Sequence, residues 1–246
     1  MAEFDKIVSK VIEKSDIVLE VLDARFIQET RNARIEQVIK KKKILIHVIN
    51  KCDHVDKRHL DKAKRKLENC VFVSAKEHLG TTLLKQKIKA LANKKRIKKP
   101  IVGVIGCPNV GKSSLINSLK GSYSAKTSQE AGYTKGEQYL RVGRNFLMID
   151  TPGVITRDKQ EEEELVLIGA KNPFAIKDPD LALIQLLNNH PGLIEGTYGV
   201  EVKDDKEDTI EDIALKLNLK RKGNLPDIER ASRKVLHDWI RGKITA

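Results

Sequence analysis

The chain of 246 residues is rich in aliphatic side chains and poor in aromatic ones, which suits one α/β domain with or without a smaller domain. No apolar run approaches the roughly 20 residues of a membrane-spanning helix, and the N-terminus lacks a signal-peptide core, so we expect a cytoplasmic protein without a membrane partner. The three cysteines, Cys52, Cys70 and Cys107, have no metal-ligand spacing and are interpreted as free thiols in a reducing compartment.

The net charge of +13 is unevenly distributed along the chain. Residues 1–100 carry 26 Lys and Arg against 13 Asp and Glu, whereas residues 101–246 carry 21 of each. The excess gathers in three stretches, Lys40–Lys43, Lys57–Lys66 and Lys94–Lys99. Such an excess attracts polyanions and therefore indicates RNA binding. The alternative is a solvated, lysine-rich surface of the kind common in heat-adapted proteins.

Helices and strands alternate along the first part of the chain. Apolar periodicity predicts helices over residues 4–14, 31–42, 57–69 and 80–93. Buried strands are predicted over residues 17–22, 44–49 and 71–73, followed by a short strand before Gly106 and a hairpin formed by residues 138–143 and 146–149. This order predicts a mostly parallel sheet with helices on both faces, whose ligand binds at the carboxyl ends of the strands.

The character of the sequence changes after about residue 165. Helical patterns remain, and no further buried strand is predicted. We therefore expect an α/β domain at residues 1–165 and a small, mostly helical domain at residues 166–246. In the last predicted helix Trp239 lies on the apolar face, so we expect it to pack in the core of the small domain rather than to stack on a base.

A phosphate-binding loop is the clearest motif, because residues 101–114 read IVGVIGCPNVGKSS. Gly106 and Gly111 allow the backbone to wrap a phosphate closely, and the start of the following helix adds its positive end. Lys112 is expected to reach the β- and γ-phosphates, and Ser113 to supply a hydroxyl to Mg²⁺. The residues predicted to bind phosphate are Pro108, Asn109, Val110, Gly111, Lys112, Ser113 and Ser114.

Two motifs that precede this loop are typical of guanine recognition: Asn50-Lys51-Cys52-Asp53 and Ser74-Ala75-Lys76. The carboxylate of Asp53 can accept two hydrogen bonds from guanine, a pair of donors that adenine lacks. The stem of Lys51 can cover the flat base, Asn50 can link its loop to the phosphate loop, and the N–H of Ala75 can donate to guanine O6. Taken alone, Asp53 could instead cap a helix.

A third motif, Asp150-Thr151-Pro152-Gly153, follows the phosphate loop. Asp150 would hold Mg²⁺ through a water, and the N–H of Gly153 would sense the γ-phosphate. Thr134 is the candidate for the second Mg²⁺-binding hydroxyl, with Thr127 as the alternative. The residues predicted to act in catalysis are Lys112, Thr134 and Gly153.

The order of these motifs is permuted, since a Ras-like protein would place the two guanine motifs after the phosphate loop. The set resembles the circularly permuted GTPases of ribosome assembly, the YlqF/YawG type. Further stretches that carry the resemblance are Asp23-Ala24-Arg25, Arg31-Asn32, GYTKGEQYLRV, DTPGV and the C-terminal LHDWIRGKI. The fold class that follows is α/β: a P-loop NTPase with a circularly permuted Ras-like GTPase sheet, then a small α-helical domain.

The resemblance implies a GTPase that binds rRNA within the large ribosomal subunit or its precursor and is released after hydrolysis. GTP or GDP and Mg²⁺ would be its cofactors, its intrinsic turnover would be low and ribosome-stimulated, and it would be monomeric off the ribosome. Val154 stands where Ras-like enzymes carry a glutamine, and His47 lies in a predicted buried strand, so we name no general base. Asn109 stands at the position of a K⁺ ligand, or else shapes the loop.

Two other function classes fit the same residues. The chain could be an RNA-binding scaffold that holds GTP or GDP with little turnover. It could also be a signalling switch that binds a protein rather than RNA. GTP turnover with and without ribosomal subunits separates the assembly GTPase from the scaffold, and salt-dependent RNA affinity separates both of these from the switch.

Overall fold

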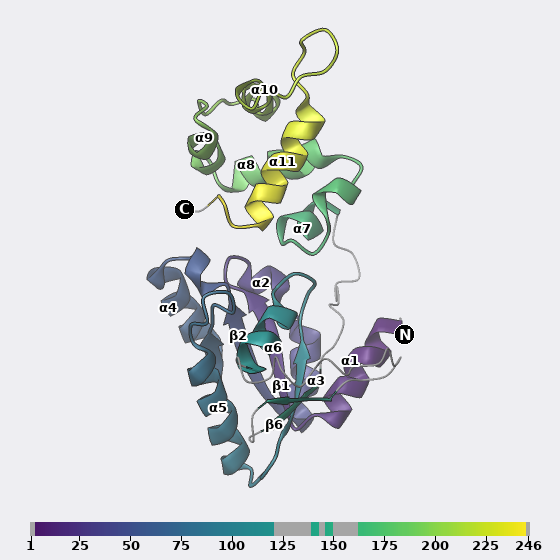
Figure 1. The fold of residues 1–246 in the computed structure, drawn as a ribbon, viewed down its shortest axis with the longest axis vertical. Helices are drawn as coiled ribbons and strands as arrows, with labels where there is room; N and C mark the ends of the chain where they lie inside the picture. Colours follow the sequence, from purple (N-terminus) through teal and green to yellow (C-terminus); the bar gives the residue numbers. More distant parts are fainter. Residues whose placement is uncertain (1–2, 121–138, 143–145, 150–161, 245–246) are drawn as a thin grey trace. The chain divides into compact units, whose positions relative to one another are not determined.

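The computed structural model describes residues 3–120, 139–142, 146–149 and 162–244 (Figure 1). The chain divides into two compact units, Met1–Thr156 and Arg157–Ala246, which are described separately. The predicted domain boundary at residues 165/166 falls inside a helix of the second unit.

A six-stranded sheet forms the centre of the first unit. Its strands are β1 (Ile17–Asp23), β2 (Ile44–Asn50), β3 (Cys70–Phe72), β4 (Ile101–Ile105), β5 (Tyr139–Val142) and β6 (Phe146–Ile149). They lie in the order β3-β2-β1-β4-β6-β5, and every neighbouring pair is parallel except the β5–β6 hairpin. The predicted mostly parallel sheet is thus confirmed, with β1 at its centre in register between β2 and β4, where Leu19 lies opposite Ile46 and Val104.

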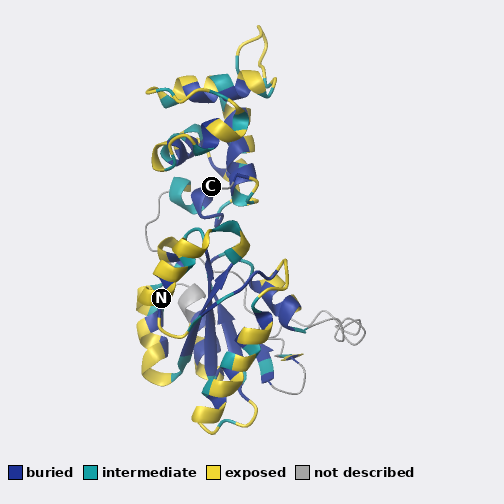
Figure 2. Cartoon of the chain, turned by 90° about the vertical axis from the view of Figure 1, so that its left-hand side faces the viewer, coloured by how far each residue is buried: buried dark blue, intermediate teal, exposed yellow. Residues whose placement is uncertain are grey.

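Helices cover both faces of this sheet, as the alternation of elements predicts. Alternate strand residues pack against α5 (Thr81–Lys94) and α6 (Lys112–Lys120) on one face. The other residues pack against α1 (Glu3–Lys14), α3 (Ala33–Lys42) and α4 (Lys57–Lys66). Figure 2 shows the buried strands in dark blue between helices whose outer surfaces are exposed. Burial on both faces explains why β1 and β2 read as nearly continuous apolar runs.

Two helix boundaries of the first unit differ from the prediction by more than one residue. The helix expected at residues 31–42 begins at Ala33, because Asn32 caps it by accepting a 3.0 Å hydrogen bond from the N–H of Ile35, and a separate short helix, α2 (Ile27–Thr30), precedes it. The helix expected at residues 57–69 ends at Lys66, because Leu67 adopts an extended conformation with φ −117° and ψ 117°.

The regular elements described in the second unit are helices, apart from an isolated antiparallel β-bridge between Lys220 and Pro226. Its elements are α7 (Glu162–Leu167), the 3₁₀ turn η3 (Pro173–Ala175), α8 (Pro179–Asn189), α9 (Leu193–Tyr198), α10 (Lys206–Lys216) and α11 (Ile228–Ile240). The prediction for Trp239 is confirmed: it is 5% exposed, and its Nε1–H donates to the carbonyl of Leu167 at 3.0 Å. The sequence patterns did not predict the short helix α9, whose length of six residues is too small for a clear period.

Two expectations from composition can be compared with the structure. The three cysteines are free thiols: Cys107 is buried, and Cys52 and Cys70 are half-buried. No helix within the described ranges is both long enough and apolar enough to cross a membrane.

Candidate nucleotide-binding site

The phosphate loop connects the end of β4 to the start of α6 at the carboxyl edge of the sheet. Three of its residues have positive φ: Gly106 (147°), Asn109 (59°) and Gly111 (95°). A Cβ added to Gly106 would lie 2.4 Å from the carbonyl oxygen of Val21, and one added to Gly111 would lie 2.3 Å from Nδ2 of Asn50. Both glycines are therefore required by close approach as well as by backbone conformation.

Lys112 is folded into this loop. Its ammonium donates to the carbonyl oxygens of Gly106 at 3.0 Å and Cys107 at 2.7 Å, and the residue is 6% exposed. Ser113 and Ser114 lie exposed on the first turn of α6. This loop therefore combines a positive charge, a helix N-terminus and two exposed hydroxyl groups. Such an arrangement is suited to binding a polyphosphate.

The other predicted phosphate-binding residues lie in the same loop with different exposure. Pro108 is half-buried, Asn109 is exposed and Val110 is buried. The left-handed conformation of Asn109 is one that asparagine tolerates better than most residues, so a role in shaping the loop has structural support.

Asn50 joins the guanine motifs to the phosphate loop. Its Nδ2 donates to the carbonyl of Val110 at 2.8 Å, and its Oδ1 accepts from the N–H of Ala75 at 3.0 Å. One buried side chain therefore links the loops that follow β2, β3 and β4, because Ala75 and Val110 lie 25 and 60 residues after Asn50. The link between the NKCD loop and the phosphate loop is present as the sequence suggests.

The N–H of Ala75 donates to Oδ1 of Asn50 at 3.0 Å in this structure. Ser74 and Ala75 are buried against the end of β2, which brings the amide to the side chain of Asn50. The donation of this N–H to guanine O6 stays a prediction. Lys76, next in the chain, is exposed and lies 3.7 Å from Glu77.

Asp53 lies in the 3₁₀ turn η1 (Cys52–His54) directly after β2. The residue is exposed, and its Oδ2 lies 3.3 Å from Nε2 of His54. It does not cap α4, because Asp56 does so by accepting a 2.7 Å hydrogen bond from the N–H of His59. The alternative role of Asp53 as a helix cap is therefore excluded, and its carboxylate is available for a base.

Sequence reasoning did not assign a role to Asp23, which the structure places beside the NKCD loop. Asp23 is fully buried at the end of β1, and its Oδ2 accepts from Nζ of Lys51 at 2.7 Å and from Nη2 of Arg25 at 2.8 Å. Burial alone would raise the pKa of this carboxyl group, yet the hydrogen bonds and charges of Arg25 and Lys51 hold the pKa below its usual 3.8. Asp23 therefore stays ionised, with two cations as partners.

The remaining predicted site residues, Thr134, Asp150 and Gly153, lie outside the described residues, as do Thr127 and Val154. Of the predicted Mg²⁺ ligands the structure places Ser113, whose exposed hydroxyl is the hard oxygen donor that Mg²⁺ prefers.

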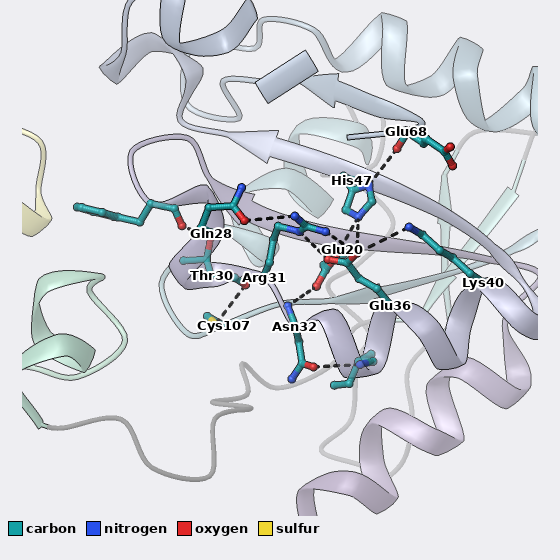
Figure 3. Close-up of polar contacts among 12 residues, drawn as sticks. Glu20, Gln28, Thr30, Arg31, Asn32, Glu36, Lys40, His47, Glu68 and Cys107 are labelled. Carbon is teal, nitrogen blue, oxygen red and sulfur yellow. Dashed lines mark hydrogen bonds and ion pairs between the residues drawn. The ribbon is translucent and has the colours of Figure 1, made fainter. Parts of the chain in front are cut away.

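A second polar cluster lies between the sheet and α3 and was not predicted (Figure 3). Ligand atoms of Glu20, Glu36 and His47, all buried, lie within 4.8 Å of one another. Nδ1 of His47 contacts the carbonyl of Glu68 at 3.0 Å, and its Nε2 lies 3.5 Å from Glu20 and 3.4 Å from Glu36. Arg31 pairs with both carboxylate oxygens of Glu36, at 2.7 and 2.8 Å. The guanidinium of Arg31 offsets the charge of Glu36, and a proton retained on Glu20 leaves the second carboxyl group neutral.

The retained proton gives a test of this cluster. Burial, followed by the charge of Glu36, raises the pKa of Glu20 from 4.5 to about 8. Between these values the folded state holds a proton that the unfolded state releases, so the free energy of unfolding must fall as the pH rises through this range. Glu20→Gln cannot titrate and should show a smaller fall in urea-unfolding free energy between pH 5 and pH 8 than the unchanged protein.

Titrations elsewhere affect both proteins, so the difference between the two curves isolates Glu20. Burial opposes the shift at Glu36, but hydrogen bonds from Arg31 lower its pKa to about 2, so Glu36 stays ionised across the same range. Parallel curves for the two proteins would show that Glu20 carries no proton at neutral pH.

Two family models match the chain. One, described as RsgA GTPase, matches residues 5–159, and the other, described as 50S ribosome-binding GTPase, matches residues 101–222. The two matches overlap on the phosphate loop and together include both guanine motifs. The predicted membership of the circularly permuted GTPases is thus confirmed.

Individual relatives agree with this. An uncharacterized GTP-binding protein of Methanocaldococcus jannaschii is 40% identical over 97% of this chain and 65% of its own length. Nucleolar GTP-binding protein 2 of Candida glabrata is 34% identical over 96% of this chain and 50% of its own length. The chain thus spans half to two thirds of the length of these relatives. The crystal structure of GNP-bound YlqF from T. maritima superposes with a TM-score of 0.72 at 23% identity, covering 98% of this chain and 94% of that one, which shows a common fold.

Proposed function

Because this chain belongs to the RsgA GTPase family and has the circularly permuted GTPase fold, we propose that it is a GTP-binding and GTP-hydrolysing assembly factor that binds rRNA in the large ribosomal subunit or its precursors. The observation that carries the nucleotide part is the side chain of Asn50, which fastens the NKCD loop and the SAK loop to the phosphate loop. The description of the second family model and the nucleolar relative support the ribosomal partner.

Each part of the nucleotide then has a partner in this chain. The carboxylate of Asp53 would accept the two guanine donors, and the stem of Lys51 would cover the base. Lys112 would exchange its two loop carbonyls for phosphate oxygens, a stronger partner because both groups are then charged. Ser113, Thr134 and Asp150 would hold Mg²⁺, which supplies charge neutralisation between the β- and γ-phosphates when bound.

Hydrolysis would be slow in the isolated protein. His47 cannot serve as a base for water, because it is 1% exposed and held between Glu68 and two glutamates beneath α3. The family resemblance leaves K⁺, with Asn109 as ligand, or the ribosome as the source of activation. We therefore propose low intrinsic turnover that rises with large ribosomal subunits, in a protein that is cytoplasmic and monomeric off the ribosome.

The RNA-binding part of the proposal rests on the exposed basic residues of the first unit. Lys40, Lys41 and Lys42 are exposed at the end of α3, and Lys94, Lys95, Arg96, Lys98 and Lys99 are exposed at and after the end of α5. Lys40 lies 3.9 Å from the carboxylate of Glu36. Most of this charge faces solvent and is available to phosphate groups.

Neutralising both clusters with glutamine should weaken binding to large-subunit particles while leaving GTP affinity nearly unchanged. Each lost phosphate contact should lower the slope of log affinity against log salt by roughly 0.7–0.9. Changing the same lysines to arginine is the matched control, since it keeps the charge and should keep the slope. If the glutamine variant retains both its binding and its slope, the clusters are a solvated surface and RNA must dock elsewhere.

The alternative function, a scaffold that holds GTP or GDP without meaningful turnover, is separated by a single measurement. Phosphate release from GTP is followed with and without large ribosomal subunits, in K⁺ and in Na⁺. A rise on adding subunits supports the assembly GTPase. Bound nucleotide with no turnover under any of these conditions supports the scaffold. If the protein binds neither RNA nor ribosomal subunits, the remaining function is the switch that binds a protein.

A further inference from the structure

The buried carboxylate of Asp23 is the most constrained charge near the guanine motifs. It is fully buried, and β1 and β2 place Asp23 directly opposite Asn50 in parallel register. The N–H of Ala24 donates to the carbonyl of Asn50 at 2.8 Å, which fixes the two strand ends to each other. The position of Asp23 is therefore set by the sheet and not by a loop.

Lys51 depends on this carboxylate. Its backbone has a left-handed φ of 60°, a conformation that lysine rarely adopts and that directs its side chain back toward the end of β1. Its ammonium lies 2.7 Å from Oδ2 of Asp23, in an ion pair whose carboxylate is shielded from water. A charge-assisted hydrogen bond of this kind is stronger than one at the surface.

We propose that Asp23 is a positioning residue for guanine recognition, which holds the ammonium of Lys51 so that the lysine stem is fixed where the base binds. The proposal rests on the proposed GTP-binding function. The proposal follows from the two ends of the Lys51 side chain. The backbone of Lys51 is in the αL conformation at one end and its ammonium is paired with Asp23 at the other, so the stem is immobilised before nucleotide binds. Preorganisation of this kind increases affinity by lowering the entropy lost on binding.

Arg25 provides the matched control. It pairs with the same carboxylate through Nε at 3.0 Å and Nη2 at 2.8 Å, and it lies over the ring of Phe26 at 5.1 Å. Arg25→Gln removes one cation from Asp23 and leaves the pair with Lys51 in place. If Asp23 acts through Lys51, Arg25→Gln should keep its GDP affinity within about twofold. If any disturbance of the buried carboxylate weakens binding, Arg25→Gln should lose as much GDP affinity as a change of Asp23 itself.

The test is a double-mutant cycle on GDP affinity, measured by titration with a fluorescent GDP analogue at a temperature where circular dichroism shows every variant folded. Asp23→Asn keeps the shape of the side chain but presents an amide to Lys51, and Lys51→Met keeps an unbranched stem without the ammonium. Each single variant should bind GDP at least about tenfold more weakly than the unchanged protein, which is the range expected when a hydrogen bond to a charged group is lost. The double variant should bind no more weakly than Lys51→Met alone.

The outcomes separate this inference from the function on which it rests. If the unchanged protein binds no GDP, the proposed function fails. If it binds GDP and Asp23→Asn binds equally well, or if the two changes are additive, or if Arg25→Gln loses as much as Asp23→Asn, the positioning role is wrong while the GTPase assignment stands.

Discussion

Lys112→Ala should abolish measurable GTP turnover and weaken binding of the triphosphate. The ammonium of Lys112 lies within the phosphate loop, where it donates to the carbonyls of Gly106 and Cys107, and we expect it to exchange these carbonyls for oxygens of the β- and γ-phosphates. Its removal leaves the developing charge on the γ-phosphate without its nearest protein partner. Loss of one donor to a developing charge typically costs about 10²–10³-fold in turnover.

The measurement is single-turnover GTP hydrolysis in the presence of large ribosomal subunits, where the rate is expected to be highest. Lys120→Ala is the matched control, because Lys120 lies at the other end of the same helix α6 and away from the loop. A Lys112→Ala protein that hydrolyses GTP as fast as the control would remove the lysine from the reaction.

The second large effect is a change of base specificity in Asp53→Asn. The amide can donate to the 2-oxo group of xanthine but cannot accept both guanine donors. GTP affinity should therefore fall and affinity for xanthosine triphosphate should rise. An unpaired polar group costs roughly 1–3 kcal/mol, or about 5- to 150-fold in affinity.

Asp56→Asn is the control for this exchange, since Asp56 caps α4 only three residues away. An asparagine can replace an aspartate as a helix cap, so neither nucleotide should change its affinity in that variant. Unchanged GTP affinity in Asp53→Asn would place the base elsewhere.

The sequence was sufficient to predict the sheet and the positions of the phosphate and NKCD loops after its strands, because both are encoded locally. The apolar runs of β1 and β2 reflect burial on both faces, and the glycines at 106 and 111 mark a loop whose backbone admits no Cβ. Each motif follows a predicted strand, so the rule that parallel strands gather their ligand at their carboxyl ends brings the motifs together.

What could not be predicted depends on pairs of residues distant in sequence. Asp23 and Lys51 are 28 residues apart, and neither local sequence pattern shows that the carboxylate of Asp23 binds the ammonium of Lys51. His47 and Glu20 both read as interruptions of apolar strands, and only the register of β1 with β2, which places them opposite each other, reveals a shared buried cluster. The hydrogen bond from Ala75 to Asn50 likewise depends on how β3 ends beside β2.

The central claim, that GTP controls association with the large ribosomal subunit, is tested most directly by co-sedimentation. Large-subunit particles are centrifuged with the protein in GDP and in a non-hydrolysable GTP analogue, and the bound fraction is measured. The account predicts more protein on the particles with the analogue than with GDP, and loss of this difference in Lys112→Ala. Equal binding in both nucleotides by a protein that binds each of them, or no binding in either, would contradict it.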